Sequence, residues 1–270
     1  MLEAAGFRYR WWDRGASETV LCLHGLGGDH RGLAELADAL PGVNVVIPDL
    51  PGYGDSAPLA SGHSLVNYAD AVAELRRALG LAHCHLLGHS LGASIALVHA
   101  ARHGSGLLSL SLLNPVSTAS NATAMLGKLY YRIAAALPGP VARFWLASRV
   151  AVYVADAFVI KTRDRARRRW ILQQDYENYR RASVPAMIES FLSYYETPFE
   201  EHAAALDMPV LLMTGERDGI APVSAVTALA GRVQNPRLTV LPDAGHLVPM
   251  EEPGQIALLV KDFLARSTVN

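Results

Sequence analysis

The serine at position 90 stands in a motif that could make it a nucleophile. Gly88-His89-Ser90-Leu91-Gly92 follows an apolar run directly and opens a helical pattern. In a Gly-x-Ser-x-Gly turn between a strand and a helix, the serine occupies a strained backbone conformation, and side chains two residues away on either side would come too close. The setting therefore predicts Ser90 as the nucleophile of an acyl-transfer reaction.

A serine hydroxyl needs a base within hydrogen-bond reach and a third group that orients that base. The apolar run 210–214 leads into Gly215-Glu216-Arg217-Asp218, and the run 238–241 leads into a loop that contains His246. Because both runs are expected to be strands, these two side chains should project from one edge of the sheet. Asp218 is the predicted acid and His246 the predicted general base.

Other carboxylates and histidines suit these roles less well. Asp207 precedes its strand, which puts it at the opposite edge, and Glu216 lies two residues before the preferred turn position. Two histidines come before or at the start of the strand that leads to Ser90, and His89 lies inside the turn itself. Those in helical or loop segments, without a strand end beside them, are His30, His63, His99, His103 and His202.

The elements that would position these side chains alternate between short apolar runs and longer helical patterns. This alternation predicts a mostly parallel sheet covered by helices. The expected strands are 7–12, 20–24, 43–47, 85–88, 107–113, 210–214 and 237–241. The expected helices are 31–39, 65–79, 91–103, 222–230 and 253–266.

The strand rhythm stops between about residues 116 and 206, where several helices are expected, with a break at Leu137-Pro138-Gly139-Pro140. This insertion holds 12 of the 24 basic residues and 8 of the 25 acidic ones, a balance of +4. Its most basic stretch, residues 161–169, is expected to be a solvated helix face. The alternative is an attraction for anionic substrates or membrane surfaces.

Composition limits the class of protein. The chain has 51% apolar and 18% charged residues and a formal net charge of −1, which fits a packed enzyme and gives no sign of nucleic-acid binding. No secretory signal and no membrane span is evident, so a cytoplasmic location is expected. Cys22 and Cys84 are expected to be buried and structural. Their spacing matches no metal motif, and we expect neither a metal ion nor a cofactor.

Five motifs in order resemble those of serine hydrolases of the α/β-hydrolase fold, similar to the esterase, lactonase and C–C hydrolase branches that carry a helical cap. They are His24-Gly25-Leu26-Gly27-Gly28, the stretch from Asp49 to Ser56, Gly88 to Gly92, Gly215 to Asp218, and Gly245-His246 with Glu251-Glu252-Pro253. The resemblance covers essentially the whole chain. It implies a mostly parallel, eight-stranded-type sheet, with residues 1–115 and 207–270 as the core and 116–206 as a cap insertion.

The resemblance also implies further site residues. The backbone N–H groups of Leu26 and Leu91 would form the oxyanion hole, and His24 is expected to brace that loop. Some hydrolases carry the acid after the strand that follows the nucleophile, but here that position is Asn114, which cannot carry the charge. Serine at position 90 argues against the epoxide hydrolases and haloalkane dehalogenases, which use aspartate.

The second motif contains two carboxylates. Asp49 and Asp55 flank a glycine-rich turn, and we expect both to hydrogen-bond the loop. Substrate contact by Asp55 is the alternative.

The aromatic residues of the cap could form an apolar pocket wall. The pocket candidates are Tyr130, Phe144, Trp145 and Tyr153. Each could instead pack a cap helix onto the core. A small-molecule substrate with an apolar or aromatic acyl group follows from the pocket hypothesis, while the motifs leave the oligomeric state open.

Three functions fit these motifs. The first is hydrolysis of a carboxylic ester or lactone through an acyl-Ser90 intermediate. The second uses the same three residues for thioester hydrolysis, C–C cleavage or a biosynthetic cyclisation, since fold alone does not select the bond. The third, a ligand receptor without turnover, gives no reason for all three catalytic residues to be present.

Overall fold

The computed structural model describes residues 1–117 and 122–267. Within these residues the chain forms an eight-stranded sheet in the order β1-β2-β4-β3-β5-β6-β7-β8. β1 pairs with β2, and β2 with β4, in antiparallel fashion, whereas every other neighbouring pair is parallel. The predicted fold class, a mostly parallel sheet flanked by helices, is confirmed.

Seven of the strands match the predicted ones with ends that differ by one residue at most. They are β2 (Phe7–Trp12), β3 (Thr19–Leu23), β4 (Asn44–Pro48), β5 (Cys84–His89), β6 (Leu107–Leu113), β7 (Val210–Gly215) and β8 (Pro236–Leu241). β1 (Leu2–Ala4) was not predicted, because an edge strand of three residues is too short to show an alternating pattern.

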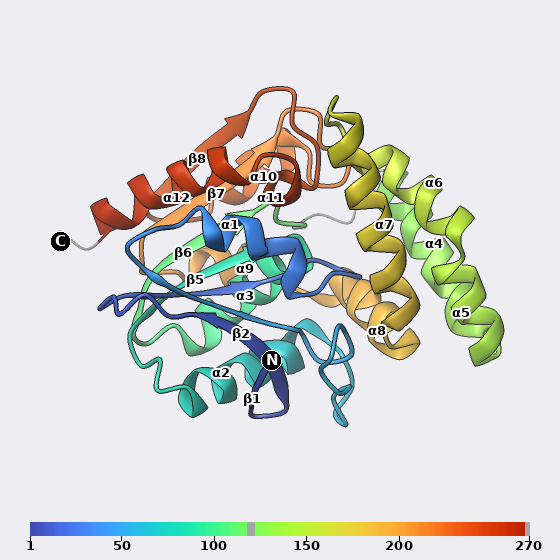
Figure 1. The fold of residues 1–270 in the computed structure, drawn as a ribbon, viewed down its shortest axis with the longest axis horizontal. Coiled ribbons are helices and arrows are strands. Elements are labelled where there is room, and N and C mark those ends of the chain that lie inside the picture. The colour runs from blue at the N-terminus through green and yellow to red at the C-terminus, as the bar shows by residue number, and fades with distance from the viewer. Residues whose placement is uncertain (118–121, 268–270) are drawn as a thin grey trace.

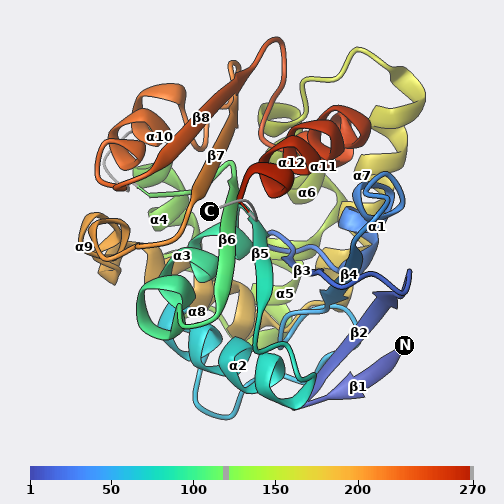
Figure 2. The same ribbon diagram turned by 90° about the vertical axis from the view of Figure 1, so that its left-hand side faces the viewer.

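Helices cover both faces of the sheet (Figures 1 and 2). α2 (Leu65–Ala78), α3 (Leu91–His103) and α10 (Val223–Ala230) pack on one face, and α1 (Ala34–Asp38) and α12 (Pro253–Ser267) pack on the other. Side chains of β3 alternate between the two layers. Leu21 and Leu23 join the first cluster, and Val20 and Cys22 join the second. Strands buried on both faces explain the continuous apolar runs in the sequence.

The chain between β6 and β7 is helical where the structure describes it. It contains α4 (Ala122–Ala136), α5 (Gly139–Ala147), α6 (Arg149–Val159), α7 (Arg165–Arg181), α8 (Val184–Ser193) and α9 (Phe199–Ala204), and a short 3-10 turn at Tyr194–Glu196. A second 3-10 turn, His30–Leu33, lies before α1. The predicted break falls between α4 and α5 at residues 137 and 138, while Gly139 and Pro140 form the first turn of α5. Figure 1 shows α4 to α7 together on one side of the molecule.

This helical layer packs against loops that follow the parallel strands. Ser183 N–H donates to the Gly52 carbonyl at 2.7 Å, and Arg31 Nη2 donates to Asn178 Oδ1 at 2.6 Å. Gly52 follows β4 and Arg31 follows β3, so the layer lies at the carboxyl edge of the sheet. Among the described residues, no helix is both long enough and apolar enough to span a bilayer.

Both cysteines are buried and free, as predicted. Burial raises the pKa of both thiols. Cys22 and Cys84 therefore act as small core residues.

Candidate active site

Ser90 occupies a sharp turn between β5 and α3. Its backbone has φ 52° and ψ −114°, a left-handed conformation that a residue with a side chain adopts only at a cost. A Cβ added at Gly88 would lie 2.2 Å from the Gly92 carbonyl oxygen, and one at Gly92 would lie 2.2 Å from the Leu23 carbonyl oxygen. Both positions therefore require glycine, which is the steric reason given for the motif.

Ser90, His246 and Asp218 form one continuous hydrogen-bonded chain. Ser90 Oγ lies 2.8 Å from His246 Nε2, and His246 Nδ1 lies 2.8 Å from Asp218 Oδ2. With Nδ1–H donating to the carboxylate, Nε2 is free to accept the serine proton. The three residues are 7%, 6% and 5% exposed. The fold thus brings together side chains that lie 128 and 28 residues apart.

Asp218 is held in place by donors on both of its oxygens. Oδ1 accepts from the N–H groups of Ile220 at 2.7 Å and Ala221 at 3.0 Å, and Oδ2 also accepts from Asn114 Nδ2 at 2.7 Å. Burial by itself would raise the pKa of Asp218, but the charge of His246 and these hydrogen bonds hold that pKa well below its usual range. Asp218 is therefore ionised under ordinary conditions.

The rival carboxylates have other surroundings. Asp207 is exposed ahead of β7, and Glu216, also exposed, accepts from the Asp243 N–H at 3.3 Å. Neither forms a hydrogen bond or an ion pair with His246 in the part of the chain that the structure describes. The geometry therefore favours Asp218 among the three carboxylates.

Asn114 stands where some hydrolases carry the acid, and in this structure it contacts Asp218. It has φ 49° at the end of β6, and its amide donates to Asp218 and, at 3.2 Å, to the Gly245 carbonyl. The amide therefore ties the acid to the loop that carries His246. Neighbouring β6 and β7 end at one edge, so a polar side chain at the end of β6 was the signal that could have indicated this contact.

His89 also contributes a contact that was not predicted. Its Nε2–H donates to the His246 carbonyl at 2.8 Å. Burial, with the neighbouring charge of His246, lowers the pKa of His89 to about 3. His89 is therefore a neutral donor that fixes the backbone of the histidine loop.

The loop of Leu26 runs beside Ser90. A Cβ added at Gly25 would lie 3.4 Å from Ser90 Cβ. His24 donates from Nδ1 to the Gly25 carbonyl at 2.9 Å and accepts from the Leu50 N–H at 2.9 Å, so it braces the loop as predicted. Leu91 is the first residue of α3, where backbone N–H groups have no acceptor within the helix. The oxyanion hole formed by the Leu26 and Leu91 amides stays a prediction.

The helical layer touches this site at two points. The His246 N–H donates to the Val159 carbonyl at the end of α6, at 3.1 Å. A Cβ added at Gly27 would lie 2.3 Å from Cε2 of the Tyr179 ring, so α7 lays an aromatic ring directly on the predicted oxyanion loop. The layer therefore adjoins both the base and the loop beside Ser90.

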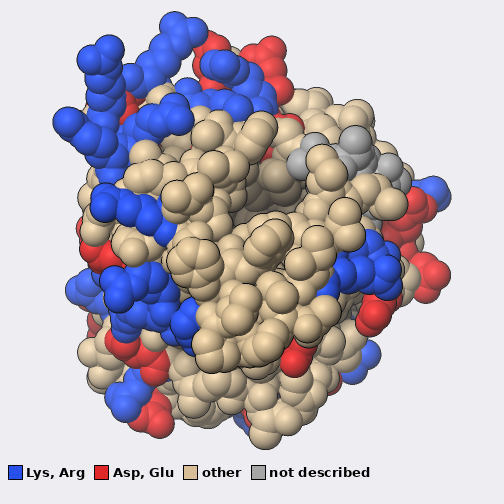
Figure 3. All heavy atoms as spheres, turned by 90° about the vertical axis from the view of Figure 1, so that its right-hand side faces the viewer, with Lys and Arg blue, Asp and Glu red and all other residues tan. Residues whose placement is uncertain are grey.

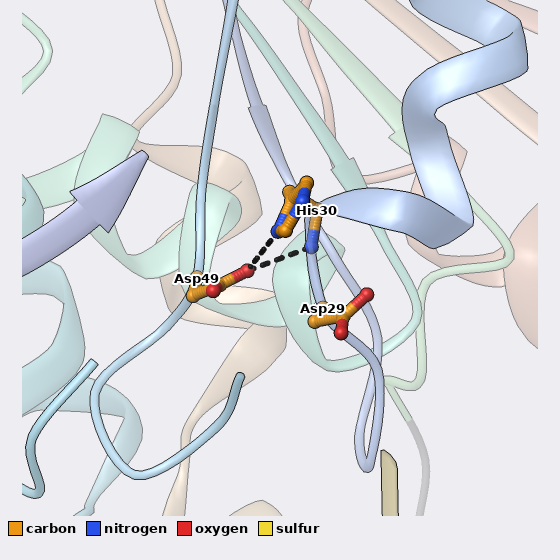
Figure 4. Close-up of side chains that lie close together, drawn as sticks. All are labelled: Asp29, His30 and Asp49. Atoms are coloured by element: carbon orange, nitrogen blue, oxygen red, sulfur yellow. Dashed lines mark hydrogen bonds and ion pairs between the residues drawn. The ribbon is translucent and has the colours of Figure 1, made fainter. Parts of the chain in front are cut away.

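Asp29, His30 and Asp49 form the closest approach to a metal-binding group among the described residues (Figure 4). Their oxygens already have N–H partners. Asp49 Oδ1 accepts from the N–H and the Nδ1–H of His30, each at 2.8 Å, and Asp29 accepts from Arg31. These contacts fit a brace between loops better than a cation site.

Asp49 and Asp55, the two carboxylates of the glycine-rich turn, both take part in contacts that hold loops together. Asp49 Oδ2 accepts from the Asp55 N–H at 2.9 Å, as expected for a loop-bonding residue. Burial alone would raise the pKa of Asp49, but His30 and the other partners hold the pKa below its usual range. Asp55 forms an ion pair with Arg181 of α7, which the sequence did not indicate.

The four pocket candidates lie elsewhere than expected. Phe144 is 74% exposed and Trp145 is 38% exposed, because α5 packs inward through Ala142 and Leu146 instead. The Tyr130 hydroxyl donates to the Trp145 carbonyl at 2.6 Å. Tyr153 accepts from Arg149 at 3.1 Å and lines an open surface groove. Phe144 and Trp145 thus lie at the outer surface of the layer, and the apolar pocket wall considered for the four aromatic residues stays a prediction.

Comparison with known proteins agrees with this architecture. A family model for the alpha/beta hydrolase fold matches residues 18–253. A pimeloyl-[acyl-carrier protein] methyl ester esterase from Neisseria meningitidis is 30% identical over 253 residues, with 92% of this chain and 94% of that protein covered. An esterase from Thermogutta terrifontis has a solved structure with a TM-score of 0.83 at 23% identity, covering 97% of this chain and 94% of that one.

A further relative matches only in part. The dihydrolipoyllysine-residue acetyltransferase component of the acetoin cleaving system from Cupriavidus necator is 39% identical over 116 residues. The match covers 41% of this chain, and the chain spans 30% of that relative's length.

Proposed function

The chain belongs to the alpha/beta hydrolase fold family, and on that premise we propose that it hydrolyses a carboxylic ester or lactone with Ser90, His246 and Asp218. The observation that carries the proposal is the hydrogen-bonded chain from Ser90 Oγ through the imidazole to Asp218, with 2.8 Å at each step. The name of the Neisseria relative, a methyl ester esterase, supports ester chemistry.

In the first half of the reaction, Ser90 Oγ attacks the substrate carbonyl carbon as its proton passes to His246 Nε2. The carbonyl oxygen becomes an oxyanion, which the N–H groups of Leu26 and Leu91 would stabilise. Asp218 keeps the imidazole in the tautomer that accepts at Nε2 and balances the charge of the imidazolium. The carbon–oxygen bond to the leaving group then breaks, and the departing oxygen takes the proton from Nε2.

In the second half, water replaces the leaving group. His246 takes a proton from the water as its oxygen attacks the acyl-Ser90 carbonyl, and the proton returns to Ser90 Oγ as the acid is released. A lactone differs only in that the leaving alcohol stays attached to the acyl chain.

We also propose that residues 116–206 act as a cap that selects the substrate. Support comes from the contact of the Val159 carbonyl with His246 and from the Tyr179 ring on Gly27. Burial raises the pKa of the Tyr179 hydroxyl, so Tyr179 would meet the substrate as a neutral aromatic. Tyr179 thus takes the place of Phe144 and Trp145 as the aromatic wall.

The test is labelling with a fluorophosphonate together with hydrolysis of a nitrophenyl ester. Wild-type protein should be labelled and active, and Ser90→Ala should lose both, with a fall in kcat/KM of about 10⁴-fold or more. Ser111→Ala is the matched control, since Ser111 is another buried serine, 2% exposed on the adjacent strand.

Two results would contradict the proposal in different ways. Equal labelling of Ser90→Ala and wild type would remove Ser90 as the nucleophile. Labelling of Ser90 without turnover of esters or lactones would keep the nucleophile and overturn the ester assignment in favour of another bond.

A further inference from the structure

The helices α4, α5 and α6 expose an unusual number of large apolar side chains. Fourteen such side chains are exposed among the residues that the structure describes, and ten of them lie on these three helices. The remaining four are Met1, Leu2, Val240 and Leu258. Single exposed apolar residues are normal, but a concentration on adjacent helices marks an interaction surface.

The spacing shows that each helix contributes one stripe. α4 exposes Met125, Leu126, Leu129 and Ile133, whose steps of three and four residues keep them on one side. α6 repeats the pattern with Val150, Val154 and Phe158, which are 75%, 54% and 70% exposed. These helices therefore bear a second apolar face in addition to the one that packs inward.

Between these two stripes, α5 adds Val141, Phe144 and Trp145, and its contacts with α4 and with α6 make the three stripes neighbours. We call the ten exposed side chains of α4, α5 and α6 the outer apolar face. Figure 3 looks onto this side of the molecule and shows a broad uncharged surface, hollowed near its middle, with basic side chains gathered mainly along one edge and acidic side chains also present at the rim.

Every exposed charge in this part of the chain is positive. Residues 122–163 contain a single acidic residue, Asp156, which is 4% exposed. The same stretch contains six basic residues, Lys128, Arg132, Arg143, Arg149, Lys161 and Arg163. Burial, with Asp175 beside it, raises the pKa of Asp156 to about 9, so this carboxyl adds no negative charge at neutral pH. Within residues 122–163, the exposed charges beside the outer apolar face are thus all cationic, while Asp243, from another segment, lies 4.0 Å from Arg163.

A groove on α6 has the same division into apolar and cationic parts. Its volume is about 630 Å³, and its lining is formed by Arg149, Val150, Tyr153, Val154, Ala157 and Phe158. Arg149, at the first turn of α6, is the one charged residue of this lining, and the others are apolar or aromatic. An acyl chain with an anionic head group matches that arrangement better than a polypeptide does.

We propose that the outer apolar face docks onto the surface of a bilayer that contains anionic phospholipid. The apolar stripes would enter the boundary between head groups and acyl chains, and the basic border would pair with lipid phosphates. Such a helix lies in the plane of the interface and does not cross it.

Docking would also bring the membrane close to the candidate active site. α6 presents Val150, Val154 and Phe158 outward, and the same helix ends at Val159, whose carbonyl accepts from the His246 N–H. An apolar substrate dissolved in the bilayer would therefore lie at the surface of the layer that adjoins Ser90.

The test is sedimentation of the full-length protein with vesicles at low salt. Wild-type protein should bind vesicles of equal parts phosphatidylcholine and phosphatidylglycerol, and bind pure phosphatidylcholine about tenfold more weakly. Phe144→Ser with Phe158→Ser should weaken binding to the mixed vesicles by about tenfold or more. Arg132→Gln with Arg163→Gln should weaken it by about tenfold.

Leu258→Ser is the matched control, because Leu258 is 71% exposed, close to the 74% of Phe144 and the 70% of Phe158, but lies on α12 away from the face (Figure 1). Its binding should equal that of wild type. Thermal unfolding of each variant reports whether the fold is retained. Repeating the measurement with Ser90→Ala, which should bind equally, separates docking from any lipid hydrolysis.

Three results would overturn the proposal. A monomeric wild-type protein that does not bind the mixed vesicles would exclude docking. Equal binding by wild type and the double phenylalanine variant would place the contact elsewhere. A wild-type dimer that does not bind vesicles, and that the phenylalanine substitutions dissociate, would assign the outer apolar face to contact between two copies of this chain.

Discussion

The edge of the sheet around Ser90 and the outer face of α4, α5 and α6 show opposite relations between side chain and surroundings. At the sheet edge, the polar groups of Ser90, His246 and Asp218 are no more than 7% exposed and are hydrogen-bonded to one another. On the helical layer, large apolar groups such as Phe144 and Val150 are about three-quarters exposed. Buried polar groups and exposed apolar groups both cost free energy, and both therefore point to interactions beyond folding.

Under the two proposals, the sheet edge carries out the reaction and the helical layer brings the protein to a membrane that holds the substrate. The sheet holds the three candidate catalytic groups at fixed distances, which the proposed reaction would require. The outer side chains of the helical layer are exposed, so we expect that layer to tolerate substitutions there. We therefore expect changes near Ser90 to abolish reaction or folding, and changes in the helices to have smaller effects.

The largest effect is expected from Asp218→Asn. The amide nitrogen would donate to His246 Nδ1 and force the proton onto Nε2, where it could no longer accept from Ser90. The value of kcat/KM for an ester should fall about 10⁴-fold while the fold is retained. A variant with near wild-type activity would show that Asp218 is not the acid, and the buried polar groups at the sheet edge would then not act as one unit.

Gly92→Ala should come next, as a loss of stability. The new Cβ would lie 2.2 Å from the Leu23 carbonyl oxygen and 2.6 Å from the His24 carbonyl oxygen, and the backbone around Ser90 would have to move. Urea unfolding should show a loss of about 3 kcal/mol or more, or the protein should fail to fold. Gly254→Ala in α12, with no atom near its Cβ, is the control and should stay within about 1 kcal/mol of wild type.

Asn114→Gly should have a smaller effect on the reaction. Glycine accepts the φ of 49° and removes only the amide that donates to Asp218 and Gly245. Because a hydrogen bond to a charged group is worth about 1.5–3 kcal/mol, kcat should fall roughly 10–100-fold with KM little changed. A rise in KM with unchanged kcat would mean that Asn114 serves substrate binding rather than the position of the acid.

The smallest effect concerns the pH dependence of stability in the helical layer. The pKa of Asp156 is raised to about 9 by burial and by Asp175. An acid whose pKa rises on folding takes up a proton on folding, so its contribution is most favourable below about pH 4 and is lost as the pH rises toward 9. Because asparagine does not ionise, Asp156→Asn removes this loss of stability at high pH.

The free energy of unfolding, measured in urea, should therefore fall less between pH 5 and pH 9 for Asp156→Asn than for wild type. The two declines should differ by about 1 kcal/mol or more. Equal declines in the two proteins would show that Asp156 ionises without cost and that the helical layer does not constrain it.

The fold was predictable where local pattern and burial coincide. Strands such as β3 and β7 are buried on both faces, so their apolar runs stand out and their ends agree with the structure to within one residue. β1 escaped prediction because three residues are too few to show an alternating pattern. The insertion was recognisable as helical, but its two apolar faces could not be told apart from the sequence.

The candidate site divides in the same way. Ser90, Asp218 and His246 were identified because each follows an expected strand at the same edge, and because the glycine spacing around Ser90 has a steric cause that acts within five residues. Phe144 and Trp145 were considered for a pocket wall because they are aromatic residues of the insertion that is expected to cover Ser90. Their outward direction depends on which side of α5 meets the neighbouring helices.

By itself, the sequence therefore determined the mostly parallel sheet and the order of the serine, the acid and the histidine, because short-range sterics and burial leave a local pattern. Only the tertiary structure decided that Asn114 donates to Asp218, that His89 and Val159 hold the His246 loop, and that three helices turn an apolar face outward. These contacts join residues from 87 to 157 positions apart, or depend on which helix face is covered. No local pattern of residues carries that information.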